Sequence, residues 1–146
     1  MTCTFFGHRD APKEIEPKLR ATLIRLIENK GVDTFYVGDR GSFDNMARNT
    51  LKNLKEEYPF IRYAVALSGV PGKRGEHDEK DYSDTFCPYV YENFHPKYAI
   101  VKRNRWLILN SDFVVTYVYK NFGGASQFKD LAVKKGKKVI ELYNIR

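Results

Sequence analysis

Short apolar runs alternate along the chain with longer amphipathic stretches. The runs are rich in β-branched and aromatic residues, and in the stretches between them apolar residues recur every three or four positions. This pattern is typical of an α/β fold, a three-layer sandwich with a mostly parallel sheet and helices on both faces. It predicts strands at Thr2–Gly7, Thr34–Val37, Ile61–Leu67, Thr85–Val90, Phe113–Tyr119 and Lys138–Tyr143. It predicts helices at Pro12–Asn29, Phe43–Tyr58, Pro96–Leu109 and Ser126–Lys135.

Three glycine-bearing turns follow strand-like runs and give the main indication of a site. They are Phe6–Arg9, Gly38–Ser42 and Phe122–Ser126. Right-handed crossovers bring the C-terminal ends of parallel strands to one edge of a sheet, where ligands bind in such folds. Glycine lets the backbone approach a ligand closely, and a helix that follows directs unpaired N–H groups at it. The turns therefore predict one site for a phosphate-bearing ligand.

The side chains in these turns indicate how such a ligand would be held. Arg9 can pair with a phosphate through two parallel hydrogen bonds. Asp39 or Asp44 would hold ribose hydroxyls, or Asp44 would only complement a helix dipole. His8 either contacts the ligand or serves as a structural hydrogen-bonding residue. The predicted ligand-binding residues are Gly7, His8, Arg9, Gly38, Asp39, Arg40, Gly41, Ser42, Asp44, Gly123, Gly124, Ala125 and Ser126.

The last turn allows two interpretations. The backbone amides of Gly124–Gln127 would form an anion nest at the start of a helix. Alternatively, Ser126 is an N-cap in a tight connection that needs flexible residues.

Length and composition restrict the class of protein. The 146 residues predict a single domain, 1–146, with one long loop at Ser68–Tyr82 that is either a lid or a tolerated insertion. No apolar stretch is long enough for a transmembrane helix, and no leader segment is expected. Cys3 and Cys87 are too few for a disulfide framework, which favours a reducing cytoplasm. No metal and no cofactor are expected.

The net charge of +7 leaves the partner open. Much of it lies in Lys134–Lys138, where cations favour the predicted end of a helix. A basic balance also suits an anionic small ligand or a nucleic acid.

The motifs, in their order, resemble the SLOG superfamily. This group includes the lysine-decarboxylase-like LOG proteins, the DNA-processing protein DprA and YpsA-like proteins of bacteria and their phages. The resemblance rests on Gly7-His8-Arg9, Gly41-Ser42-Phe43-Asp44, Asn110-Ser111-Asp112 and Gly123-Gly124, and the YpsA-like branch is the most similar. It covers nearly the whole chain and implies a Rossmann-like fold that binds nucleotides or nucleotide-derived ligands.

The resemblance also implies candidate catalytic residues. LOG enzymes cleave the N-glycosidic bond of nucleoside 5′-monophosphates with an Arg and a Glu, whose places are taken here by Arg103 and Asp130. The motif's second Gly and its Thr are Ser126 and Gln127 here. Asp is shorter than Glu, and the lost Gly restricts approach to phosphate, so these departures favour binding over hydrolysis.

Three functions follow from the sequence, in order of preference. The first is a sensor or sponge for an ADP-ribose or NAD-derived ligand, acting as a homodimer or higher oligomer. The second is a nucleotide N-glycosidase that uses Arg103 and Asp130. The third is binding of single-stranded nucleic acid, with bases stacking on Tyr117, Tyr119 and Phe122.

Overall fold

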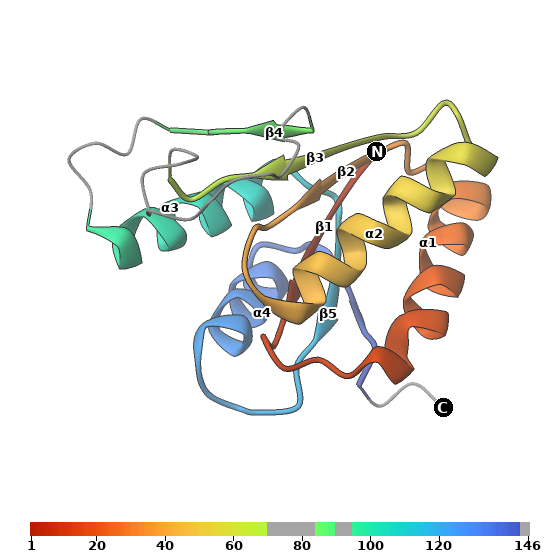
Figure 1. Ribbon diagram of the computed structural model, residues 1–146. Coiled ribbons are helices and arrows are strands. Elements are labelled where there is room, and N and C mark those ends of the chain that lie inside the picture. The colour runs from red at the N-terminus through yellow and green to blue at the C-terminus, as the bar shows by residue number, and fades with distance from the viewer. Residues whose placement is uncertain (70–83, 90–94, 144–146) are drawn as a thin grey trace.

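The computed structural model describes residues 1–69, 84–89 and 95–143. These residues form a six-stranded sheet in the order β4-β3-β2-β1-β5-β6, with parallel pairing throughout (Figure 1). The parallel sheet predicted from the sequence is thereby confirmed. The strands are β1 (Thr2–Gly7), β2 (Thr34–Val37), β3 (Arg62–Ala66), β4 (Thr85–Phe86), β5 (Phe113–Tyr117) and β6 (Lys138–Glu141).

Helices cover both faces of the sheet (Figure 1). A short 3-10 turn, η1 (Lys13–Ile15), leads into α1 (Glu16–Lys30), which packs with α2 (Gly41–Glu57) on one face. The other face carries α3 (Pro96–Leu109) and α4 (Gly124–Lys134). None of the described helices is long and apolar enough to cross a membrane.

Neighbouring residues of β1 enter the two cores, because successive side chains of a strand point to opposite faces. Phe5 packs between Phe35 and Phe43 on the face of α1 and α2. Phe6 stacks on Phe128 on the face of α3 and α4, with ring centroids 5.7 Å apart. Burial of each such ring contributes about 1.5–3 kcal/mol to folding.

Several element ends differ from the predictions: β4 ends at Phe86, β5 at Tyr117 and β6 at Glu141, β3 is one residue shorter at each end, and α2 begins at Gly41. Two helix starts differ for local reasons. The first helix begins at Glu16 because Pro17 has no N–H to donate to the Lys13 carbonyl, which leaves a 3-10 turn before it. The last helix begins at Gly124, with Gly123 at φ 95° as its N-cap, so the prediction that Ser126 is the N-cap is wrong. Val90, the predicted end of β4, and residues 70–82 of the predicted long loop lie outside the described residues.

The strand order places a topological switch point between β1 and β5. From β1 the chain adds β2, β3 and β4 in one direction, and it then returns through α3 to add β5 and β6 on the other side of β1. Connections therefore leave β1 and β5 in opposite directions at their C-terminal ends. In open α/β sheets this arrangement opens a crevice between the strand ends.

Candidate functional site

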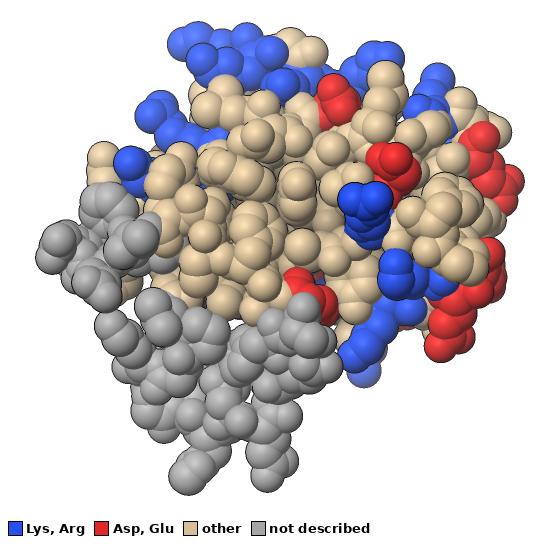
Figure 2. Space-filling model, turned by 90° about the horizontal axis from the view of Figure 1, so that it is seen from above, with Lys and Arg blue, Asp and Glu red and all other residues tan. Residues whose placement is uncertain are grey.

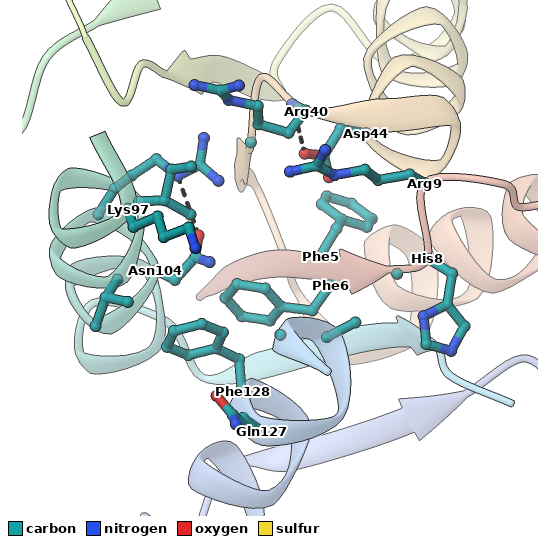
Figure 3. Close-up of a pocket in the computed structure, with 17 residues that line it drawn as sticks. Phe5, Phe6, His8, Arg9, Arg40, Asp44, Lys97, Asn104, Gln127 and Phe128 are labelled. Carbon is teal, nitrogen blue, oxygen red and sulfur yellow. Dashed lines mark hydrogen bonds between the residues drawn. The ribbon is translucent and has the colours of Figure 1, made fainter. Parts of the chain in front are cut away.

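A cavity of about 460 Å³ occupies the switch point (Figure 3). The C-terminal ends of β1 and β2, the start of α2, one face of α3 and the first turn of α4 all contribute to it. It is lined by Phe5, Phe6, Gly7, His8, Arg9, Gly38, Arg40, Asp44, Lys97, Ile100, Val101, Arg103, Asn104, Gly124, Ala125, Gln127 and Phe128. All three predicted glycine turns therefore reach one cavity.

Two of the glycines at the cavity are required by close packing. A Cβ at Gly7 would lie 2.4 Å from the ring of Phe43, and a Cβ at Gly38 would lie 2.5 Å from Oδ2 of Asp44. Both contacts are shorter than real Cβ atoms show, so any larger residue would displace its neighbour. These glycines bring β1 and β2 close to the start of α2.

Gly124 has no such neighbour. No atom lies within 4 Å of a Cβ built on it, and its φ is not positive. Gly123, which precedes it, has a φ of 95° and needs glycine for its backbone conformation. The backbone conformation of Gly123 thus explains why that residue is a glycine. Neither backbone conformation nor packing against the described residues explains why Gly124, which lines the cavity, is a glycine.

Arg103 is fixed at the base of the cavity. Its guanidinium forms an ion pair with Asp39, and its Nε donates to Oδ1 of Asn104 at 3.0 Å. Only 3% of Arg103 is exposed. Asp39 also accepts hydrogen bonds from the amide and the hydroxyl of Ser68. The ends of β2, β3 and α3 are therefore joined by one buried polar network.

Asp44 is the one carboxyl group among the residues that line this cavity. Its Oδ2 accepts the amide of Arg40 at 2.9 Å. Burial raises the pKa of Asp44 to about 7. The positive charges of Arg103 and Arg9 oppose this rise in pKa, and the negative charge of Asp39 adds to it. A substantial fraction of this carboxyl is therefore protonated near neutral pH, which weakens its repulsion of an anion.

Cations outnumber carboxylates around the cavity. Arg9, Arg40, Lys97 and Arg103 line it, and Figure 3 shows the Arg9 side chain beside Asp44 and Lys97 beside Asn104. No ion pair with a described residue holds Arg9 or Lys97. The cavity is therefore suited to an anionic ligand.

Elsewhere the basic residues are distributed in separate groups. Figure 2 shows Lys and Arg side chains in several separate groups, with tan surface and some Asp and Glu side chains between them. On this face they do not form one continuous basic surface. The Lys and Arg side chains visible on this face therefore do not form a continuous binding surface for a long polyanion.

His8 lies at the cavity, but its ring is used for structure. Figure 3 shows the ring directed away from the cavity. Its Nε2 accepts the amides of Tyr119 and Lys120 at 3.1 and 3.2 Å. Burial and then the Lys120 ammonium lower the pKa of His8, so the ring is held neutral as an acceptor. His8 thereby ties the first glycine turn to the connection that leads to α4.

The remaining predicted residues lie outside this cavity. Ser42 donates its hydroxyl to the Ala11 carbonyl at 2.7 Å and its amide to the Arg9 carbonyl, so it fastens the turn after β1 to α2. Gly41, at φ 89°, is in close contact with Arg9. Asp39 does not line the cavity itself, but its ion pair holds Arg103, which does. The predicted residues that do not line the cavity are Asp39, Gly41, Ser42, Gly123, Ser126 and Asp130.

The two candidate catalytic residues are not brought together. Arg103 lines the main cavity, whereas Asp130 and Ser126 line a second cavity of about 320 Å³ on the other side of α4. No group of three His, Cys, Asp or Glu side chains that could hold a metal occurs in residues 1–69, 84–89 and 95–143.

Sequence reasoning missed one wall of the cavity. Lys97, Ile100, Val101 and Asn104 line it from α3 and are spaced at i, i+3, i+4 and i+7, which places them on one helical face. The spacing on one helical face could be predicted from the sequence. The sequence does not show which part of the sheet that face packs against. Gln127 and Phe128 from α4 were missed for the same reason.

The fold and the site at its switch point define a Rossmann-like α/β protein. The chain is similar to DNA processing protein A (DprA) from Streptococcus pneumoniae, with a TM-score of 0.68 and 17% sequence identity. The similarity covers 96% of this chain and 49% of that protein, so the chain spans about half its length. At this identity the likeness establishes the fold alone. No protein-family model and no curated protein matches the sequence.

Proposed function

We propose that the main cavity binds a nucleotide or a nucleotide-derived ligand through its phosphates. The observation that carries this proposal is Gly124, a glycine that lines a cationic cavity without any packing reason to be glycine. No described residue accepts a hydrogen bond from the backbone amides of residues 123–126. Such amides at a helix start bind phosphate well.

The cavity also has a place for the uncharged part of a nucleotide. Phe128, Ile100 and Val101 line its apolar side, whereas Arg9 and Arg40 line the side near α2. A base or sugar would bury apolar surface against the first group while the phosphates reach the cations. This division of polar and apolar walls is common in small-molecule sites.

The biological version that we favour is a sensor or sponge for an ADP-ribose or NAD-derived signal. It is supported by the SLOG-like order of the motifs and by a cavity in which Arg103 is not paired with Asp130. A YpsA-like affiliation and a cytoplasmic setting belong to the same proposal. We also propose self-association, because Tyr98 and Leu109 on α3 are exposed apolar side chains outside the cavity.

The two alternatives have weaker support. An N-glycosidase would need Arg103 and Asp130 on one bond, but they line different cavities. Stacking of single-stranded nucleic acid would use Tyr119 and Phe122, which are exposed, but not Tyr117, which is buried. Release of free base from a nucleoside monophosphate, lost in Asp130→Asn, would revive the first alternative.

Calorimetric titration with ADP-ribose tests the proposal with a matched pair of variants. Lys97 and Arg105 are both exposed cations on α3, but only Lys97 lines the cavity. We expect Lys97→Ala to weaken binding about tenfold, as for loss of a charged hydrogen bond. Arg105→Ala should leave the affinity unchanged. Equal losses in both variants, or no binding to the parent protein, would contradict the proposal.

A further inference from the structure

The second cavity lies directly beside the first. It is formed by the β5–α4 connection, α4 and the end of β6. Its lining residues are Val118, Tyr119, Lys120, Asn121, Ser126, Lys129, Asp130 and Tyr143. Apart from the backbone amide of Ser126, none of them is used by the proposed phosphate site.

The first turn of α4 lies between the two cavities. It contributes Gly124 and Ala125 to the main cavity and Ser126 to the second one. No atom lies within 4 Å of a Cβ built on Gly123 or on Gly124. His8, which lines the main cavity, contacts Tyr119, which lines the second one, with ring centroids 4.4 Å apart. A ligand that crosses the double glycine would meet no side chain from it.

The second cavity offers aromatic rings and hydrogen-bonding groups together. Tyr119 and Tyr143 are 38% and 45% exposed, and their ring centroids lie 5.7 Å apart. The ammonium of Lys120 lies 5.2 Å from the centroid of Tyr119. Asp130 supplies an exposed carboxyl group of the kind that holds ribose hydroxyls. These are the groups that bind a sugar or a base.

The rings are held in place before any ligand arrives. The Tyr119 hydroxyl donates to Asp10 at 2.8 Å. The Tyr143 ring packs edge-on against the Tyr117 ring, with centroids 5.8 Å apart, and the Tyr143 amide donates to Glu141. Little conformational entropy would therefore be lost when a ligand packs against this surface.

We infer that the second cavity is a subsite for a second sugar-bearing unit of the same ligand. The phosphates would lie over the first turn of α4, one unit in the main cavity and the other against Tyr119 and Tyr143. The ligand class is thus two sugar-bearing units joined through phosphate, rather than a mononucleotide. This inference rests on the proposed function, and it gives Asp130 a role in binding sugar hydroxyls.

The test compares three probes by calorimetry: ADP, ADP-ribose and a 5′-phosphorylated thymidine dinucleotide. ADP carries the same pyrophosphate as ADP-ribose but lacks the second sugar. The variants are Tyr143→Ala, Tyr143→Phe and Lys120→Gln, with Phe60→Ala as an exposed aromatic control that lines neither cavity. Thermal unfolding of each variant confirms that it is folded.

We expect at least one two-unit probe to bind about tenfold or more tightly than ADP. The second thymine of the dinucleotide can stack on a Tyr ring, and the second ribose of ADP-ribose can donate hydrogen bonds to Asp130. Tyr143→Ala should remove this advantage without changing the affinity for ADP, and Tyr143→Phe should restore it. Tighter binding of ADP-ribose would indicate a dinucleotide-like signal, whereas tighter binding of the thymidine dinucleotide would indicate a nucleic-acid strand. Equal affinity for ADP and both two-unit probes, or an equal loss for all probes in Tyr143→Ala, would overturn the subsite while the main site stands. Binding of no probe would overturn the proposed function and the subsite with it.

Discussion

The ring of His8 packs edge-on against the ring of Tyr119, and its Nε2 accepts the Tyr119 amide at 3.1 Å. This contact joins residues 111 positions apart in the chain. It links the turn after β1 to the connection that leads into α4, so the two strand ends at the switch point are fixed relative to each other. The geometry of the proposed phosphate site depends on that link.

Protonation of His8 should loosen this link. Burial and Lys120 lower the pKa of His8 in the folded protein, while Asp10 and Glu141 oppose the shift. His8 therefore binds a proton more readily in the unfolded chain than in the folded protein. The stabilisation is therefore present above the ordinary value of 6.5 and is lost as the pH falls below it. Urea unfolding from pH 8 to pH 5 measures it.

The variant His8→Gln supplies the control for that titration. A Gln side chain can accept from the same amides but does not titrate in this range. The free energy of unfolding of the variant should depend less on pH than that of the parent protein below the ordinary His pKa. Identical pH profiles would show that His8 is not the group responsible.

Asp44 should give the opposite pH dependence. Its pKa is raised from 3.8 to about 7 in the folded protein, chiefly by burial. The folded state therefore binds the proton more tightly than the unfolded chain. Its contribution to stability is complete below pH 3.8 and is lost as the pH rises toward 7. Asp44→Asn should remove this slope, since Asn still accepts the Arg40 amide.

Two glycines should respond differently to alanine. Gly38→Ala places a Cβ against Asp44 and should destabilise the fold by about 1–3 kcal/mol, as overpacking does. Gly124→Ala has open space and helical backbone, so its stability should change by less than about 0.5 kcal/mol. Thermal unfolding measures both, and similar losses would show that Gly124 has an unrecognised packing role.

Arg103 should matter for stability as well as for binding. Arg103→Met removes the buried partner of Asp39 and leaves that carboxylate only the longer contact with Arg40 at 4.0 Å, so the loss should be at most about 3 kcal/mol. The double variant with Asp39→Asn should recover part of that loss, because no uncompensated charge is then buried. A double-mutant cycle on the free energy of unfolding checks this, and additive losses would contradict it.

Much of the fold and part of the site could be predicted from the sequence. Hydrophobic periodicity located the strands and helices, and the glycine turns at strand ends located the cavity, because both are local signals. The role of Ser42 could not be predicted, since its hydroxyl is used by the distant Ala11 carbonyl. Asp130 and Gln127 are three residues apart on α4, yet they line different cavities. Only the orientation of the helix against the sheet separates them.

We propose that position 124 is a glycine because a phosphate must approach the helix amides there. The most direct measurement is calorimetric titration of ADP-ribose into the parent protein, Gly124→Ala and Lys134→Ala, a change in the last turn of the same helix. We expect Gly124→Ala to remain as stable as the parent protein and to bind ADP-ribose at least about tenfold more weakly, since the added methyl group displaces the phosphate from the helix amides. Lys134→Ala should bind normally. Unchanged affinity in Gly124→Ala would contradict the account.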